Sequence, residues 1–137
     1  MKLTFYSTPG HGYLRVPKSV FVKCGGDPKE ISGFSGHDLS TLYLEEDCDA
    51  GYFLNLLESK GIDYEIESKY VNSVSNTHNY DPQLFGCRLV GGERIVLFND
   101  SVGIIQNVSG KILAEVNGIR YRLPKANPFK YIKSVIQ

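Results

Sequence analysis

The sequence contains no tryptophan, one methionine and three cysteines in 137 residues. Cys24, Cys48 and Cys87 lie far apart, without a Cys-x-x-Cys pair and without a histidine at zinc-ligand spacing. This pattern argues against a disulfide framework and a zinc finger, and it predicts reduced thiols in a cytoplasmic protein. Because a chain of this length can bury a sizeable core, it needs no metal or disulfide to hold it together. Since no metal-binding or cofactor-binding motif occurs either, we expect neither a metal nor a cofactor.

Long hydrophobic runs are also lacking. The chain has no apolar stretch of about 18 residues, the length that a membrane-spanning helix requires, and its start lacks the apolar core of a signal peptide. The motifs of metalloproteases, EF-hand loops and glycine-rich nucleotide-binding loops do not occur. The sequence therefore predicts no membrane partner and contains no strong catalytic motif.

The chain as a whole has no net charge, because 15 Lys/Arg balance 15 Asp/Glu, but the charges are unevenly distributed along it. Residues 1–80 carry seven Lys/Arg against eleven Asp/Glu, whereas residues 81–137 carry eight against four. The two parts thus have net charges of −4 and +4. This asymmetry indicates two distinct surfaces, one suited to a cationic partner and one to an anionic partner.

Residues 1–70 show an α+β pattern. Aromatic and β-branched segments at 2–7 and 11–16 predict a hairpin, and a short helix is expected at 17–23. The segment 41–67 predicts a strand, a helix from about 50 to 60 and a further strand, in a ββαββαβ-like order. Asp47 or Asp49 is expected to cap the longer helix, and Gly61 to end it.

The polar segment 71–83 is typical of a linker or an exposed loop. From residue 84 to 137 the pattern changes to closely spaced short strands. Together they predict a small antiparallel, β-rich part resembling an SH3-like barrel. The five strands are expected at FGCRLV (85–90), ERIVLF (93–98), VGIIQNV (102–108), KILAEV (111–116) and IRYRL (119–123).

Asn117-Gly118 lies between two alternating strands and predicts a two-residue hairpin turn. The register that follows places two sets of side chains on opposite faces, and it puts Glu115 opposite Arg120 for an ion pair. The apolar face holds Ile112, Ala114, Val116, Ile119, Tyr121 and Leu123, and the other face holds Lys111, Glu115, Arg120 and Arg122.

The first candidate site is the acidic cluster Glu45, Glu46, Asp47 and Asp49. Converging carboxylates can bind a cation or meet the basic surface of a partner. Acids in the first turn of a helix are also favoured by the helix dipole, without any further function. We expect partner binding here and no metal, because no metal-loop motif accompanies the cluster.

The second candidate is the trio His11, Tyr13 and Arg15, which alternate along one strand. They could bind an anionic ligand or act as a general acid and base. Packing under a neighbouring loop, with Arg15 paired to a carboxylate, is the simpler structural interpretation.

The third candidate is a basic set in the C-terminal part. Arg120, Arg122, Lys125 and Lys130 could neutralise phosphates while nearby aromatic rings stack on bases. A solvated strand face is the alternative interpretation.

Two segments carry a resemblance to known proteins. HGYLRVP at 11–17 and YLEEDCDAGYF at 43–53, with ISGFS between them, resemble a family of small uncharacterised proteins encoded by bacteria, their phages and plasmids. The likeness covers about the first 80 residues and brings no catalytic residues with it. It implies a bacterial host cytoplasm and a mobile element, whose small products often bind host proteins.

From these observations we expect a non-enzymatic binding protein that contacts a host macromolecule, for instance as an inhibitor of a defence system. A protein partner is the leading interpretation. One alternative is a nucleic-acid-binding module that uses the basic C-terminal part. The other is a small enzyme that acts on an anionic substrate through His11, Tyr13 and Arg15.

Overall fold

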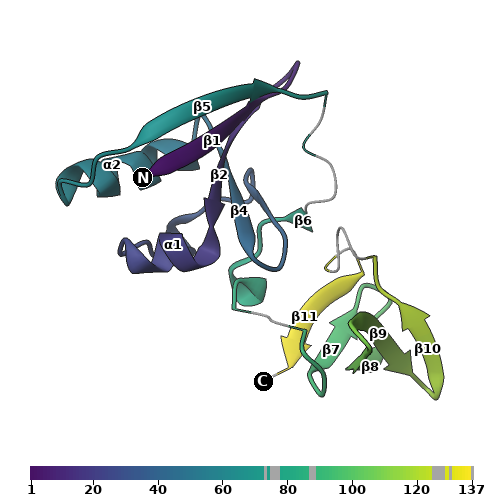
Figure 1. The fold of residues 1–137 in the computed structure, drawn as a ribbon. Coiled ribbons are helices and arrows are strands. Elements are labelled where there is room, and N and C mark those ends of the chain that lie inside the picture. Colours follow the sequence, from purple (N-terminus) through teal and green to yellow (C-terminus); the bar gives the residue numbers. More distant parts are fainter. Residues whose placement is uncertain (73, 75–77, 87–88, 125–128, 130, 137) are drawn as a thin grey trace. The chain divides into compact units, whose positions relative to one another are not determined.

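A computed structural model describes residues 1–72, 74, 78–86, 89–124, 129 and 131–136 (Figure 1). The chain divides into two units, Met1–Pro82 and Gln83–Gln137. Strands dominate both units, and the two α-helices of the described residues belong to the first. The α+β class predicted from the sequence is therefore confirmed. Within the part of the chain that is described, no helix is long and apolar enough to cross a membrane.

The first unit contains a six-stranded sheet with the strand order β5-β1-β2-β4-β3-β6. Strands β1 and β5 are parallel, and the other neighbouring strands are antiparallel. The predicted ββαββαβ order is confirmed. Along the chain the elements are β1 (Lys2–Ser7), β2 (Gly12–Pro17), α1 (Lys18–Lys23), the 3-10 turn η1 (Pro28–Glu30), β3 (Gly36–His37), β4 (Thr41–Glu45), α2 (Asp49–Ser59), β5 (Glu65–Tyr70) and β6 (His78–Asn79), and a second 3-10 turn, η2 (Pro82–Leu84), follows.

The core of the first unit lies between the sheet and its helices. Phe21 of α1 stacks on Phe53 of α2, with ring centroids 5.9 Å apart, so both helices cover the same face of the sheet. Alternate residues of β2 and β4 on this face, such as Leu14 and Leu44, are fully buried. Full burial of each such large apolar side chain stabilises the folded state by about 1.5–3 kcal/mol.

Helix α2 begins differently from the prediction. Its N-cap residue is Cys48, and no side chain makes a capping hydrogen bond, so the predicted cap by Asp47 or Asp49 is wrong. Asp49 is instead the first helical residue, where the dipole still favours a negative charge. The helix ends as expected, because Gly61 adopts the left-handed φ of 66° and its N–H donates to the Glu58 carbonyl.

The described end of segment 71–83 is more ordered than a linker. Strand β6 pairs with β3, and Tyr80 is buried with its ring 5.1 Å from that of His37. The Tyr80 hydroxyl donates a hydrogen bond to the Pro28 carbonyl. The interpretation as an exposed loop is therefore wrong for these residues, because an aromatic side chain within the polar run supplies the buried contact.

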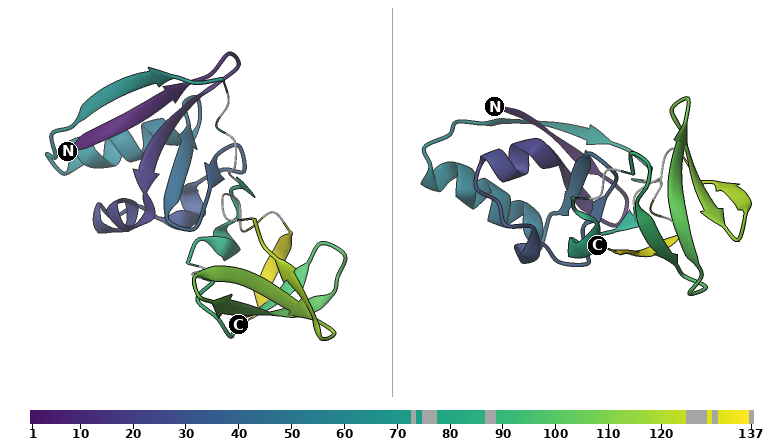
Figure 2. Two further views of the ribbon diagram at one scale, coloured as in Figure 1. Left: turned by 45° about the vertical axis from the view of Figure 1, so that its right-hand side comes forward. Right: turned by 90° about the horizontal axis from the view of Figure 1, so that it is seen from below.

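The second unit is a five-stranded antiparallel sheet with the order β10-β9-β8-β7-β11, seen from two sides in Figure 2. Strands β10 and β11 are its two edges, and no pairing closes the sheet into a barrel among its described residues. The antiparallel, β-rich prediction is confirmed, but the closed form of a barrel is not reached. The strands are β7 (Arg94–Leu97), β8 (Val102–Val108), β9 (Lys111–Val116), β10 (Ile119–Arg122) and β11 (Ile132–Ile136).

One of the five predicted strands is misplaced. The described residues of 85–90 form turns and irregular backbone, and Leu89 has a left-handed φ of 49°. The N–H groups of Val90 and Gly91 donate to the carboxylate of Glu93 instead of to a neighbouring strand. The fifth strand is β11, in the C-terminal tail, which pairs with β7.

The hairpin of β9 and β10 has the predicted register. Asn117 and Gly118 both have positive φ, at 52° and 78°, as a two-residue turn of this kind requires. Val116 pairs with Ile119 and Glu115 with Arg120. The predicted ion pair between Glu115 and Arg120 is not formed, and the Glu115 carboxylate instead accepts a hydrogen bond from the side-chain amide of Gln106.

Candidate functional site

The acidic cluster lies where β4 ends and α2 begins. Glu45 is the last residue of β4, Asp49 is the first of α2, and Glu46 and Asp47 lie in the turn between them. Glu46 and Asp47 are exposed, whereas Glu45 and Asp49 are only 5% and 4% exposed. The four carboxylates therefore do not form one acidic surface. The burial of Glu45 and Asp49 is at odds with their predicted contact with a partner.

Asp49 instead holds the loop at residues 31–35. Both of its carboxylate oxygens lie 3.1 Å from the Ser32 backbone nitrogen, and one lies 2.7 Å from Ser32 Oγ. The Ser35 hydroxyl also donates to Asp49, and Ser35 Oγ accepts from the backbone N–H of Glu45 at 3.0 Å. Because a buried charge is costly without donors, these hydrogen bonds explain why Asp49 can lie inside the unit.

Glu45 is held between a backbone donor and a histidine. One of its carboxylate oxygens accepts from the backbone N–H of Asp47 at 2.9 Å, and the other lies 3.8 Å from His11 Nδ1. His11 is exposed, and its backbone N–H donates to the Thr8 hydroxyl within the turn between β1 and β2. Glu45 therefore lies between this turn and the start of α2.

The predicted trio of His11, Tyr13 and Arg15 is divided. His11 and Tyr13 line a cavity of about 400 Å³ together with Glu45 and Cys48, but Arg15 does not. Arg15 lies beside Tyr43 of β4. Burial and then the charge of Asp38 raise the pKa of Tyr43, and Arg15 acts in the opposite direction.

Cys48 lines the same cavity as His11, and its thiol is a possible nucleophile. Desolvation, a hydrogen bond with Glu45 and the negative charges of Glu45, Asp49 and Asp47 raise the pKa of the Cys48 thiol. Since the thiolate is the reactive form, this environment makes Cys48 a poor nucleophile. The cavity therefore lacks the features of an activated cysteine site.

Three carboxylates of the acidic cluster are close enough to share a cation. Oxygen atoms of Glu45, Glu46 and Asp47 all lie within 4.8 Å of one another. Hard cations such as Ca²⁺ prefer oxygen ligands of this kind. Two of the three residues are exposed, and exposed acidic groups are common without an ion. The spacing alone therefore assigns no metal to the cluster.

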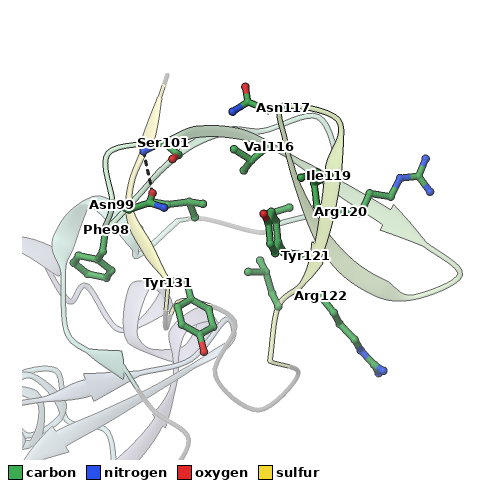
Figure 3. Close-up of a pocket in the computed structure, with 13 residues that line it drawn as sticks. Phe98, Asn99, Ser101, Val116, Asn117, Ile119, Arg120, Tyr121, Arg122 and Tyr131 are labelled. Carbon is green, nitrogen blue, oxygen red and sulfur yellow. Dashed lines mark hydrogen bonds between the residues drawn. The ribbon is translucent and has the colours of Figure 1, made fainter.

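A larger cavity of about 830 Å³ lies in the second unit, on the face of the sheet that holds its core (Figure 3). Buried Ala114 and Val116 of β9 contribute to its lining. Four large side chains border it, each about half exposed, and we call this site the aromatic groove. They are Phe98 after β7, Ile119 and Tyr121 of β10, and Tyr131 before β11.

Two of the four predicted basic residues, Arg120 and Arg122, belong to the lining of this groove. Arg120 and Arg122 alternate with Ile119 and Tyr121 along β10, and Figure 3 shows both arginine side chains directed away from the space between Tyr121 and Tyr131. Both arginines are exposed. Lys125 and Lys130 lie outside the described residues.

The sequence pattern placed Ile119 and Tyr121 on one apolar face of the hairpin, but it did not indicate a groove there, and it did not single out Phe98. The signal that could have identified a groove is the size of the unit. Only 55 residues belong to it, and small units bury a smaller fraction of their surface. An apolar residue at an edge strand or beside a turn, such as Phe98, is then left partly uncovered.

Comparison of the chain with protein-family models, curated proteins and solved structures gives no match. The resemblance of the N-terminal segments to a phage and plasmid family therefore remains a prediction. Function has to be inferred from the geometry of the two units.

Proposed function

We propose that this chain is a binding protein without catalytic activity, and that it contacts a protein partner through the aromatic groove. The groove carries the proposal, because exposed and contiguous apolar side chains in a small unit mark an interaction site more often than a solvated surface. Its volume lies in the range of about 300–1,000 Å³ that is usual for binding pockets. Tyrosine and phenylalanine are also the side chains that interfaces favour.

The proposal moves the contact surface away from the acidic cluster. Only Glu46 and Asp47 of that cluster are accessible, which leaves two charges where four were expected. Exposed charges of this kind add little affinity by themselves. The resemblance of the N-terminal segments supports a bacterial host macromolecule, such as a component of a defence system, as the partner.

Two observations favour binding over catalysis in the first unit. Arg15 is outside the cavity that contains His11 and Tyr13, so an anionic substrate there would lack its guanidinium. The raised pKa of Cys48 keeps its thiol protonated. The enzyme interpretation therefore has less support than a binding function.

The test is an affinity capture from nuclease-treated bacterial lysate with three forms of the chain. Tyr121→Ser removes a half-exposed ring from the groove, and Tyr70→Ser removes an exposed ring from strand β5 of the other unit as the matched control. We expect a protein that the wild type and Tyr70→Ser retain and that Tyr121→Ser loses. If every captured protein is retained by Tyr121→Ser, the groove is not the contact site and the proposal fails.

Binding of single-stranded nucleic acid is a second candidate. Exposed Tyr121 and Tyr131 could stack on bases while Arg120 and Arg122 neutralise phosphates. Such binding weakens steeply with salt. Fluorescence anisotropy of a labelled oligonucleotide between 50 and roughly 200 mM salt separates the candidates. A steep fall in affinity with salt that depends on both arginines supports nucleic-acid binding. The absence of binding excludes this second candidate.

A further inference from the structure

We propose that the aromatic groove accepts an extended peptide in which acidic and apolar residues alternate, added as a strand to the open edge of β10. This inference rests on the proposed binding function and specifies the chemistry of the partner. It is carried by three features of the hairpin: an unpaired edge, two side-chain faces of opposite character and an uncompensated positive charge.

The edge of β10 offers backbone groups for a further strand. Strand β10 is the last strand of the sheet order, and among the described residues its only pairing partner is β9. In an antiparallel pair alternate residues bond to the partner strand. The two-residue turn makes Ile119 and Tyr121 these residues, and the Leu123 N–H continues the pattern by donating to Ile112 at 3.0 Å. The peptide groups of Arg120 and Arg122 therefore face the open edge, which can template a further strand.

The two faces of β10 dictate alternation in the added strand. All four residues of β10, from Ile119 to Arg122, line the groove, but in Figure 3 the side chains of Arg120 and Arg122 point away from the space between Tyr121 and Tyr131. Side chains of neighbouring strands that lie opposite each other share a face. One set of alternate residues would thus enter the groove, and the other set would meet the arginines. Main-chain bonding combined with pockets for alternate side chains is a known mode of peptide recognition.

Charge selects acidic residues for the second set. Residues 83–137 carry eight Lys/Arg against three Asp/Glu, a net charge of +5. The nearest carboxylate across the strand pair, Glu115, is engaged by Gln106, and among described residues neither Arg120 nor Arg122 forms an ion pair. A phosphodiester chain would satisfy this charge, but its backbone has no N–H donors for the edge carbonyls and so cannot extend the ladder as a strand does. The open edge therefore favours a peptide over nucleic acid.

The direct test uses a fluorescein-labelled ten-residue peptide of alternating Glu and Leu with the full-length chain, followed by anisotropy. Two N-methylated versions, one methylated on every Glu and one on every Leu, block opposite edges of the peptide. We expect one version to lose at least tenfold in affinity and the other to bind like the parent. Equal loss in both, or no loss in either, would overturn the strand addition.

Charge reversal tests the second face. The double variant Arg120→Glu/Arg122→Glu should lose at least tenfold in affinity for the Glu-Leu peptide and gain affinity for a Lys-Leu peptide. Arg94→Glu on β7 is the matched control, because it lies three strands away, about 14 Å from Arg120 at the usual strand spacing. If the double variant binds both peptides as the wild type does, the assigned charge recognition is wrong.

Other occupants give different results. An oligonucleotide that displaces the peptide, or an arginine-dependent dimer seen by light scattering, would overturn the peptide proposal in favour of nucleic acid or a second copy. Strand β5 of another copy is the segment that a dimer would offer, because Glu65 and Glu67 alternate with Ile66 at an edge of its sheet. Tyr121-dependent capture of a protein that also binds the charge-reversal variant would leave the proposed function intact while refuting the recognition of acidic residues by Arg120 and Arg122.

Discussion

Replacing Asp49 by alanine should destabilise the first unit strongly. The change removes the acceptor of the Ser32 N–H, the Ser32 hydroxyl and the buried Ser35 hydroxyl. A hydrogen bond to a charged group contributes about 1.5–3 kcal/mol. Removal of the buried charge recovers part of this loss, so we expect a decrease of about 3–5 kcal/mol in the free energy of unfolding. Because domains are stable by only about 5–15 kcal/mol, the variant should be close to unfolding at room temperature.

The assay has to report on the first unit alone, because two units can unfold in separate steps. Cys24 is buried in that unit, so its alkylation along a urea titration measures the opening of the unit. Asp49→Asn keeps one carbonyl oxygen as an acceptor and should lose about half as much stability. Asp47→Ala, at an exposed neighbour, should stay within about 0.5 kcal/mol of the wild type. A loss below about 1 kcal/mol for Asp49→Ala would refute the structural role assigned to this carboxylate.

Two further predictions concern a crowded glycine and a thiol. An alanine at Gly103 would place its Cβ 2.9 Å from a valine methyl group of β9, so Gly103→Ala should destabilise the second unit by about 1–3 kcal/mol in urea unfolding, whereas Gly86→Ala has open space around it. Equal stability of the two variants would contradict this. Asp47→Asn removes one of the negative charges that raise the pKa of Cys48, so at a fixed pH near 8 the thiolate fraction and the alkylation rate should rise. Glu46→Gln is the control for Cys48, and an equal rate increase there would point to a general charge effect.

The parts of the fold that were predicted correctly depend on local patterns. The alternation along β9 and β10, together with the Asn117-Gly118 turn, fixes the register without information from elsewhere in the chain. The succession of strand β4 and helix α2 is likewise visible in the local sequence pattern of residues 41–61. Gly61 ended α2 as expected, because few other residues adopt a left-handed φ without strain.

The parts that were not predicted depend on contacts between distant residues. Ser32 and Ser35 lie 17 and 14 positions before Asp49, so the sequence next to Asp49 does not indicate which residues donate hydrogen bonds to its carboxylate. The choice of β11 over residues 85–90 as the fifth strand is also a long-range decision, since it depends on pairing with β7. The local sequence pattern of the acidic cluster therefore led us to expect Glu45 and Asp49 at the surface, although both are buried.

The anchoring of the loop by Asp49 has a thermodynamic consequence for the residue at its tip. Phe34 is 75% exposed, and it lies between Ser32 and Ser35, both of which donate to the same buried carboxylate. Its own N–H donates to Ser32 Oγ at 3.3 Å, which further restrains the backbone. Any molecule that packs against this ring would meet a loop already ordered by folding. Binding would therefore not have to order the loop, and its free energy would not be reduced by that loss of conformational entropy.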